Sequence, residues 1–142
     1  IYKEIILDYY RNPRNFGKID SPSFSASDSN PLCGDDIEIQ VKVGSDNKVE
    51  DVKYNGRGCA ISQASASMLT EFIMNKDVSD LQKLDKHDIL KMLGIEMLEL
   101  NPVRIKCALL SLKVFKVGLY NHLGAGDLKN ESSDLNDSDA GT

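Results

Sequence analysis

Apolar residues recur at helical spacing at the start of the chain, which predicts an amphipathic helix over residues 1–11. The positions that set this spacing are Ile1, Ile5, Ile6 and Tyr9. Asn12-Pro13 ends the helix, because proline disfavours helical backbone in the residue before it. Residues 15–30 are rich in glycine, serine and proline and predict a connector, with one weak strand at residues 24–26.

The pattern then changes to strict alternation, which predicts a half-buried strand over residues 37–43. Its apolar positions are Ile37, Ile39, Val41 and Val43. A turn at residues 44–47 leads to a second strand that contains Val52 and Tyr54. Val49 is one position out of register with Val52, so this strand starts late or carries a bulge. Two strands joined by a short turn predict an antiparallel hairpin.

Helical spacing returns after Gly58 and predicts three helical regions. The first stripe is Ile61, Ala64, Met68 and Phe72, and small residues from Ala60 to Ser67 predict close packing at that end. Residues 75–77 end this helix, and residues 79–94 predict one or two short helices with core positions Leu81, Leu84, Ile89, Leu90 and Leu93. Asn101-Pro102 suits the start of a long last helix. Its apolar stripe is Ile105, Ala108, Leu109, Leu112, Phe115 and Leu119.

Composition bounds the class of protein. A chain of 142 residues with 41% hydrophobic and 27% charged residues fits one globular domain, which we place at residues 1–123. The formal net charge is −5, and the residues from Asp127 onward contribute −4 of it. Residues 124–142 are therefore predicted to be an acidic, disordered tail, and the sequence pI of about 5.0 argues against a nucleic-acid surface.

Cellular context follows from what the sequence lacks. It has no apolar run long enough to cross a membrane and no hydrophobic signal segment, although it opens at Ile1 without methionine. Its three cysteines are odd in number and far apart, which is a poor disulfide framework. Reduced thiols in the cytoplasm are the expectation.

Each cysteine lies at a predicted boundary between elements. Cys33 and Asp35 are two residues apart in a tight loop, Cys59 precedes a helix, and Cys107 is in the second turn of the last helix. A helix N-terminus favours a thiolate at Cys59, and the positive charge of Lys106 does the same at Cys107. Three such thiols and one carboxylate make a complete tetrahedral ligand set. The alternative is a buried cysteine beside a turn aspartate, and the spacing matches neither a zinc finger nor a ferredoxin.

Long motifs around these residues resemble the U-type iron–sulfur cluster scaffold family, which comprises IscU, SufU and the N-terminal part of NifU. The motifs are Asn30-Pro31-Leu32-Cys33-Gly34-Asp35, Gly56-Arg57-Gly58-Cys59-Ala60-Ile61-Ser62-Gln63-Ala64-Ser65-Ala66-Ser67 and Arg104-Ile105-Lys106-Cys107. The resemblance runs from about Tyr2 to Tyr120 and includes the segment Tyr9–Gly17. It implies an α+β fold with a small antiparallel sheet of about three strands backed by helices. It also implies a metal site made of Cys33, Asp35, Cys59 and Cys107, with a cysteine desulfurase as the sulfur donor.

Two features depart from single branches of the family. Lys106 stands where IscU proteins have histidine and is similar to SufU, whereas the chain between Cys59 and Cys107 is shorter than in SufU proteins. Residues 100–104 resemble only part of the chaperone-binding motif of IscU proteins. The resemblance thus leaves the branch and the use of a chaperone open, and a homodimer is among the states it allows.

Three functions are compatible with this reading. The first is a non-enzymatic scaffold that holds a nascent [2Fe-2S] cluster or iron and passes it to acceptor apoproteins, where the oxygen ligand Asp35 eases release. The second is a zinc-containing sulfurtransferase of the SufU type, with zinc on the same ligands and one cysteine, expected to be Cys107, carrying persulfide with the assistance of Lys106. The third is a structural zinc protein, which would more naturally use only cysteine and histidine.

Other candidates carry less weight. His87 and His122 are the only histidines, and both are expected to be solvated rather than paired with a nucleophilic thiol. Asp36 competes with Asp35 as a ligand, but strand alternation points the two side chains to opposite faces.

Overall fold

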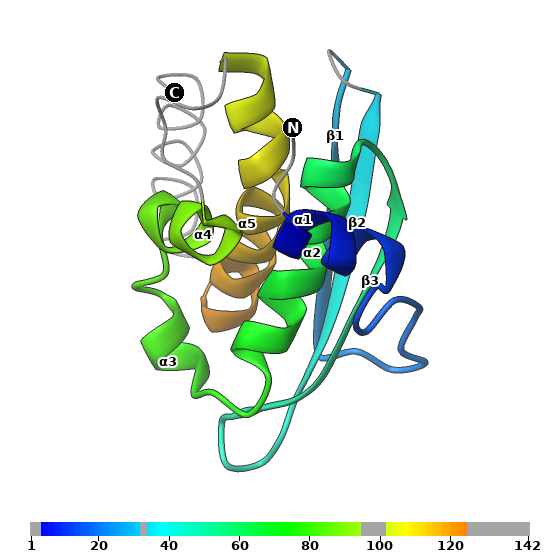
Figure 1. Ribbon diagram of the computed structural model, residues 1–142. Coiled ribbons are helices and arrows are strands. Elements are labelled where there is room, and N and C mark those ends of the chain that lie inside the picture. Colours follow the sequence, from blue (N-terminus) through cyan, green and yellow to red (C-terminus); the bar gives the residue numbers. More distant parts are fainter. Residues whose placement is uncertain (1–3, 32–33, 95–101, 125–142) are drawn as a thin grey trace.

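The computed structural model describes residues 4–31, 34–94 and 102–124 of the chain (Figure 1). These residues form an α+β fold, as predicted, with a three-stranded antiparallel sheet and five helices. The elements are, in order, α1 (Glu4–Arg11), β1 (Phe24–Asn30), β2 (Asp35–Val43), β3 (Val49–Arg57), α2 (Ala60–Ile73), α3 (Val78–Leu81), α4 (Lys86–Leu93) and α5 (Pro102–Leu123).

The hairpin of β2 and β3 is the centre of the sheet, and its register follows the alternation in the sequence. Ile39 pairs with Tyr54, and Val41 pairs with Val52. All four residues are at most 1% exposed, so one face of the hairpin is buried. The register shifts at Lys42 and Val43. The out-of-register Val49 is therefore explained by a bulge, and β3 does not start late.

Strand β1 is longer than the sequence predicts. The prediction stopped at Ala26 because the inward positions beyond that residue are not hydrophobic. The sequence indicates a strand only at residues 24–26, whereas β1 continues to Asn30 and pairs with β2 along its whole length. Asp28 forms an ion pair with Lys113 of α5, with 3.2 Å between Oδ2 and Nζ. Asn30 is buried and pairs with Asp35 in the strand register. An ion pair with α5 at Asp28 and strand pairing with β2 at Asn30 thus accompany the polar end of β1.

Helices α2 and α5 pack on the sheet, α1 lies against α2, and α4 contacts both α2 and α5 (Figure 1). Every predicted stripe residue of α5 is buried, and so are Leu110, Val114 and Lys116 on its other sides. Most of the middle of α5 is therefore buried, as in a helix of a fold's core. In α2 the prediction is wrong for Phe72, which is 37% exposed and lies under the Lys76 ammonium at 4.5 Å rather than in the core.

The remaining boundaries agree with the sequence reading where they can be compared. Helix α2 ends before Asn75, which takes a left-handed φ of 67°, and residues 78–93 form two short helices with all five predicted core positions buried. Residues 1–3 of the predicted first helix, the predicted cap Asn101 and residues 125–142 lie outside the described residues. The division into a domain at 1–123 and a tail at 124–142 therefore stays a prediction.

Candidate metal centre

Asp35 enters the site as the first residue of β2, two residues earlier than the predicted start of that strand. Gly34 precedes it with a left-handed φ of 70°, and the Gly34 N–H donates to the Asn30 carbonyl at 2.9 Å. Glycine accepts this backbone conformation without strain. The side chain of Asp35 is 1% exposed, whereas Asp36 is exposed. The two carboxylates thus point to opposite faces, as strand alternation predicts.

Cys59 enters the site as the N-cap of α2, with extended backbone angles. Its N–H donates to Asp35 Oδ1 at 2.9 Å. In a capping box, the side chain three residues into the helix takes this N–H. Here the Asp35 carboxylate, from strand β2, accepts the N–H in place of a side chain of the helix. The Cys59 sulfur accepts no capping hydrogen bond, is a free thiol and lies 4.0 Å from Asp35 Oδ2.

Gly58 makes this approach sterically feasible. A Cβ atom at Gly58 would lie 2.4 Å from Asp35 Oδ1 and 2.5 Å from the Ser62 hydroxyl oxygen. Both distances are shorter than any normal carbon–oxygen contact, so only glycine fits between the strand and the helix. The glycine before Cys59 is therefore part of the site's geometry.

Cys107 completes the part of the site that lies within the described residues. It sits in the second turn of α5, is 0% exposed, and brings its sulfur to within 4.8 Å of ligand atoms of both Asp35 and Cys59. Two ligands of one tetrahedral metal are separated by roughly 3.3–3.8 Å when the bonds are about 2.0–2.3 Å long. An inward movement of about 1 Å would therefore give these three groups bonding distances.

Cys33, the fourth predicted ligand, lies outside the described residues. The described residues nearest to it are Pro31, in a turn, and Gly34, and Asp35 follows at the site itself. The placement of Cys33 as a ligand stays a prediction that rests on its position two residues before Asp35.

The donor set fits a soft divalent metal or an iron–sulfur cluster. Asp35 is buried, and its described hydrogen-bond donors are the N–H and, weakly, the thiol of Cys59. The ion pairs of the described residues lie elsewhere, between Arg14 and Asp8 and between Lys113 and Asp28. A buried carboxylate normally has a cationic partner. A metal ion bound by Asp35 and the two sulfurs would supply that charge.

Lys106 does not form an ion pair with Asp35. It is half-buried in the first turns of α5, next to Cys107. The first turns of α2 and α5 contain no acidic residue, so neither helix places a negative charge against the ligands. The positive N-termini of α2 and α5 and the charge of Lys106 therefore lie on the side of the ligand group.

The two histidines are exposed and do not join the site. His122 instead stacks on Phe24, with ring centroids 5.1 Å apart. Among the residues that sequence reasoning did not single out, Ser62 contacts the site, since its hydroxyl oxygen is 3.9 Å from the Cys59 sulfur. The available signal was its position three residues after Cys59, one helical turn along α2.

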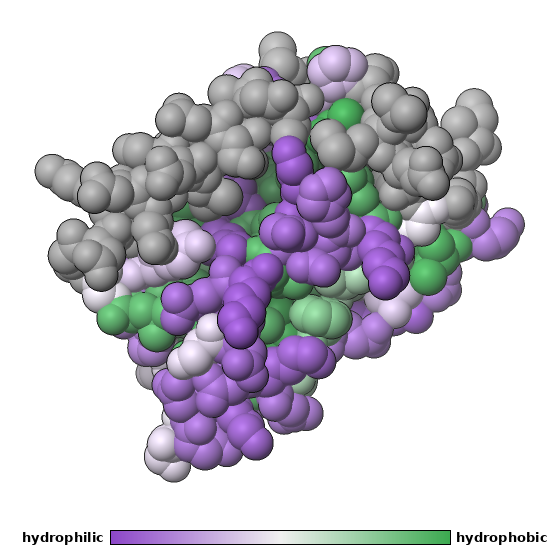
Figure 2. Space-filling view, turned by 90° about the vertical axis from the view of Figure 1, so that its left-hand side faces the viewer, coloured by the Kyte–Doolittle hydropathy of each residue, from purple (hydrophilic) through white to green (hydrophobic). Residues whose placement is uncertain are grey.

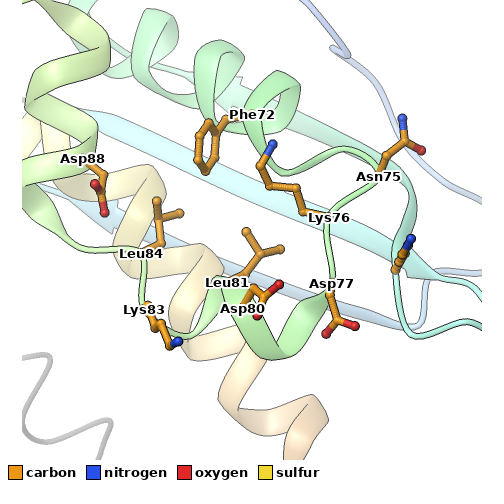
Figure 3. A pocket seen from close by; sticks show the side chains of 10 residues that line it. Phe72, Asn75, Lys76, Asp77, Asp80, Leu81, Lys83, Leu84 and Asp88 are labelled. Carbon is orange, nitrogen blue, oxygen red and sulfur yellow. The ribbon is translucent and has the colours of Figure 1, made fainter.

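A pocket of about 510 Å³ lies at the opposite end of α2 from Cys59, between that helix, α3 and α4 (Figure 3). Phe72, Leu81 and Leu84 supply its apolar lining, and lysines and aspartates supply most of its polar lining. On this side of the molecule, polar side chains surround an apolar hollow (Figure 2). Neither cysteine nor histidine is among the residues that line the pocket, so it lacks the donor chemistry of the first site.

No helix within the described residues is long and apolar enough to cross a membrane.

Comparison with known proteins gives consistent matches over most of the chain. The sequence model of the NifU-like N-terminal domain family matches residues 1–127. The zinc-dependent sulfurtransferase SufU of Bacillus subtilis is 38% identical over 141 residues, which cover 87% of this chain and 92% of that protein. The iron–sulfur cluster assembly scaffold protein IscU of Escherichia coli K12 is 31% identical over 131 residues, covering 90% and 98%.

The fold is also similar to solved structures. A crystal structure from Fervidobacterium islandicum, described as an iron–sulfur cluster assembly scaffold protein of the SUF system, superposes with a TM-score of 0.72 at 29% identity and covers 83% of this chain and 96% of that one. A NifU-like N-terminal domain from Brucella abortus has the same TM-score at 18% identity, which supports the fold alone.

Proposed function

The chain belongs to the NifU-like N-terminal domain family, and from this premise we propose that it is a scaffold on which a [2Fe-2S] cluster is assembled and then transferred to acceptor apoproteins. The observation that carries the proposal is the meeting of Asp35, Cys59 and Cys107 within 4.8 Å of one another. Cys33 would be the fourth ligand. In this role the protein is not an enzyme, because the cluster is its cargo.

The mixed ligand set suits temporary storage. Thiolates are the preferred ligands of iron in such clusters, so a single carboxylate oxygen is the weakest of the four bonds. Asp35 Oδ1 is already engaged by the Cys59 N–H, which leaves Oδ2 to face the metal. A ligand that binds through one oxygen can detach without disturbing the backbone of α2, and this favours release to an acceptor.

The sulfur would come from a cysteine desulfurase, and we propose Cys107 as its first acceptor, with Lys106 assisting. Cys107 is disulfide-bonded in this structure, so the step starts after a thiol reductant has cleaved that bond. The Cys107 thiolate would then attack the outer sulfur of the donor's persulfide, forming a new S–S bond while the donor cysteine leaves as a thiolate. Cys107 is 0% exposed whereas Cys59 is half-buried, so this step requires the first turns of α5 to move outward. Mapping the added sulfur by mass spectrometry tests the assignment, and undiminished transfer to Cys107→Ser would contradict it.

A zinc-containing sulfurtransferase is the second candidate, in which zinc occupies the same ligands. Two observations favour it, namely the lysine directly before Cys107 and the 38% identity to the SufU protein of Bacillus subtilis. Cytoplasmic location and a homodimer are expectations that go with either function.

Cluster transfer tests the proposal directly. The protein is loaded anaerobically with iron and desulfurase-derived sulfide, separated from free iron, and mixed with an apo-ferredoxin. A scaffold gives a visible cluster spectrum that passes to the ferredoxin. If the protein acquires zinc and persulfide but never an iron–sulfur spectrum, the sulfurtransferase function replaces the scaffold.

A further inference from the structure

Ser62 is a buried polar residue in the first turn of α2 whose hydroxyl lies beside the Cys59 sulfur. Its relative exposure is 0%. The hydroxyl donates to the Cys59 carbonyl at 3.1 Å, and its oxygen is 3.9 Å from the Cys59 sulfur, which acts as a weak donor toward it. The thiol and the hydroxyl are thus already neighbours, and Asp35 Oδ2, at 4.0 Å, is the second acceptor within reach of the thiol hydrogen.

This arrangement must change when Cys59 binds a metal. A metal-bound thiolate has lost its hydrogen and can only accept hydrogen bonds. The Cys59 sulfur accepts none from the N–H groups of α2, and the Cys59 N–H itself is taken by Asp35. Ser62 can turn its O–H toward the sulfur without leaving an unpaired group, because the Cys59 carbonyl also accepts the Gln63 N–H at 3.1 Å.

The absence of a side chain at Gly58 leaves room for the Ser62 hydroxyl at this contact. The space beside Gly58 is filled by the Ser62 hydroxyl, which would lie 2.5 Å from any Cβ there. The serine oxygen therefore packs between the loop that precedes α2 and the sulfur. Groups that form hydrogen bonds to a metal ligand without touching the metal influence how strongly that ligand binds.

We propose that Ser62 is a positioning residue for Cys59, which donates a hydrogen bond to the metal-bound thiolate and so weakens the bond between sulfur and metal. The proposal rests on the proposed function only in taking Cys59 as a metal ligand. A hydrogen bond withdraws electron density from the sulfur, which makes the metal easier to release. Ser62 would therefore act in the same direction as the weak oxygen ligand Asp35.

The test compares Ser62→Ala with Ser62→Thr, which keeps the hydroxyl, and with Ser65→Ala as a matched control. Ser65 is also buried in α2, but its hydroxyl bonds to the Ala108 carbonyl at 2.6 Å and to Ser111, not to Cys59. Each protein is loaded with cobalt(II) alone, and two quantities are measured, the energy of the sulfur-to-cobalt charge-transfer band and the rate of cobalt loss to a chelator.

Ser62→Ala should move the charge-transfer band to lower energy and slow cobalt loss by roughly two- to tenfold, the effect of one hydrogen bond. Ser62→Thr should restore both values, and Ser65→Ala should leave the band unchanged. An unchanged band in Ser62→Ala, or equal shifts in the Ser62 and Ser65 variants, would overturn the role of Ser62. If the wild-type protein itself shows no sulfur-to-cobalt band, Cys59 is not a ligand, and both the metal site and this inference fail together.

Discussion

Replacing Gly58 by alanine probes the connection between strand β3 and helix α2, where it meets Asp35 of β2, with a single methyl group. That methyl would lie 2.4 Å from Asp35 Oδ1, 2.5 Å from the Ser62 hydroxyl and 2.9 Å from the Asp35 carboxyl carbon. The carboxylate must therefore recede by at least about 0.6 Å to reach the shortest contacts that side chains make. Its hydrogen bond to the Cys59 N–H, now 2.9 Å, would stretch to about 3.5 Å and effectively break.

Two costs combine in Gly58→Ala. Overpacking costs about 1–3 kcal/mol, and a buried N–H that loses its acceptor costs about 1–3 kcal/mol. The same shift of the Asp35 carboxylate relieves the overpacking and breaks the hydrogen bond, so the two costs do not add in full. We therefore expect a loss of about 2–4 kcal/mol in the free energy of unfolding. For a domain of this size that is a fall in Tm of about 8–15 °C. Metal affinity should fall as well, since the displaced group is the proposed ligand Asp35.

The assay is thermal unfolding of the metal-free protein, followed by cobalt(II) titration. Gly124→Ala is the matched control, because a Cβ at Gly124 meets no atom within 4 Å. Its Tm should stay within about 2 °C of wild type. If Gly58→Ala unfolds and binds cobalt like the wild-type protein, Asp35 and the start of α2 are not packed as described, and the derived geometry of the site is wrong.

Three further predictions concern the site ligand, the core and the tail. Asp35→Ala should lengthen the lifetime of a bound cluster and slow its transfer to an apo-ferredoxin, because the weak oxygen ligand is gone; faster loss would show that Asp35 secures the cluster. Burial raises the pKa of Tyr54 from 10.0 to about 12, so the fold favours the neutral phenol, and this contribution to stability is complete below pH 10 and is lost as the pH rises to 12. Denaturant unfolding at pH 8 and pH 11 should therefore show a larger loss for wild type than for Tyr54→Phe, and equal losses would refute the assignment. Cutting the chain after Gly126 removes a net charge of −4 and little apolar surface, so Tm and metal binding should not change, whereas a drop of several degrees would mean that the tail docks on the domain.

Much of the fold follows from local patterns in the sequence. Alternation in residues 37–43 and the shifted Val49 predict the hairpin with its bulge, because a pleated strand with one wet face imposes a period of two. The apolar stripe of α5 predicts a buried helix. Strand β1 could not be read beyond Ala26, since its inward Asp28 and Asn30 become acceptable only through partners on α5 and β2.

The site was predictable in outline but not in its internal contacts. Placing Cys59 and Cys107 near helix starts and Asp35 at the start of a strand is enough to suggest convergence, and ligand atoms of these three residues lie within 4.8 Å of one another. The hydrogen bond from the Cys59 N–H to Asp35 was not predictable, because it depends on the missing side chain of Gly58 and on tertiary packing. The complete burial of Cys107 depends in the same way on how α5 packs against its neighbours.

The most direct test of the central claim is the visible spectrum and metal content of the full chain purified without oxygen. A scaffold should be a brown protein with sulfur-to-iron charge-transfer bands, which Cys59→Ser or Cys107→Ser should abolish or alter. A colourless protein that carries stoichiometric zinc on the same residues would contradict the scaffold and support the sulfurtransferase.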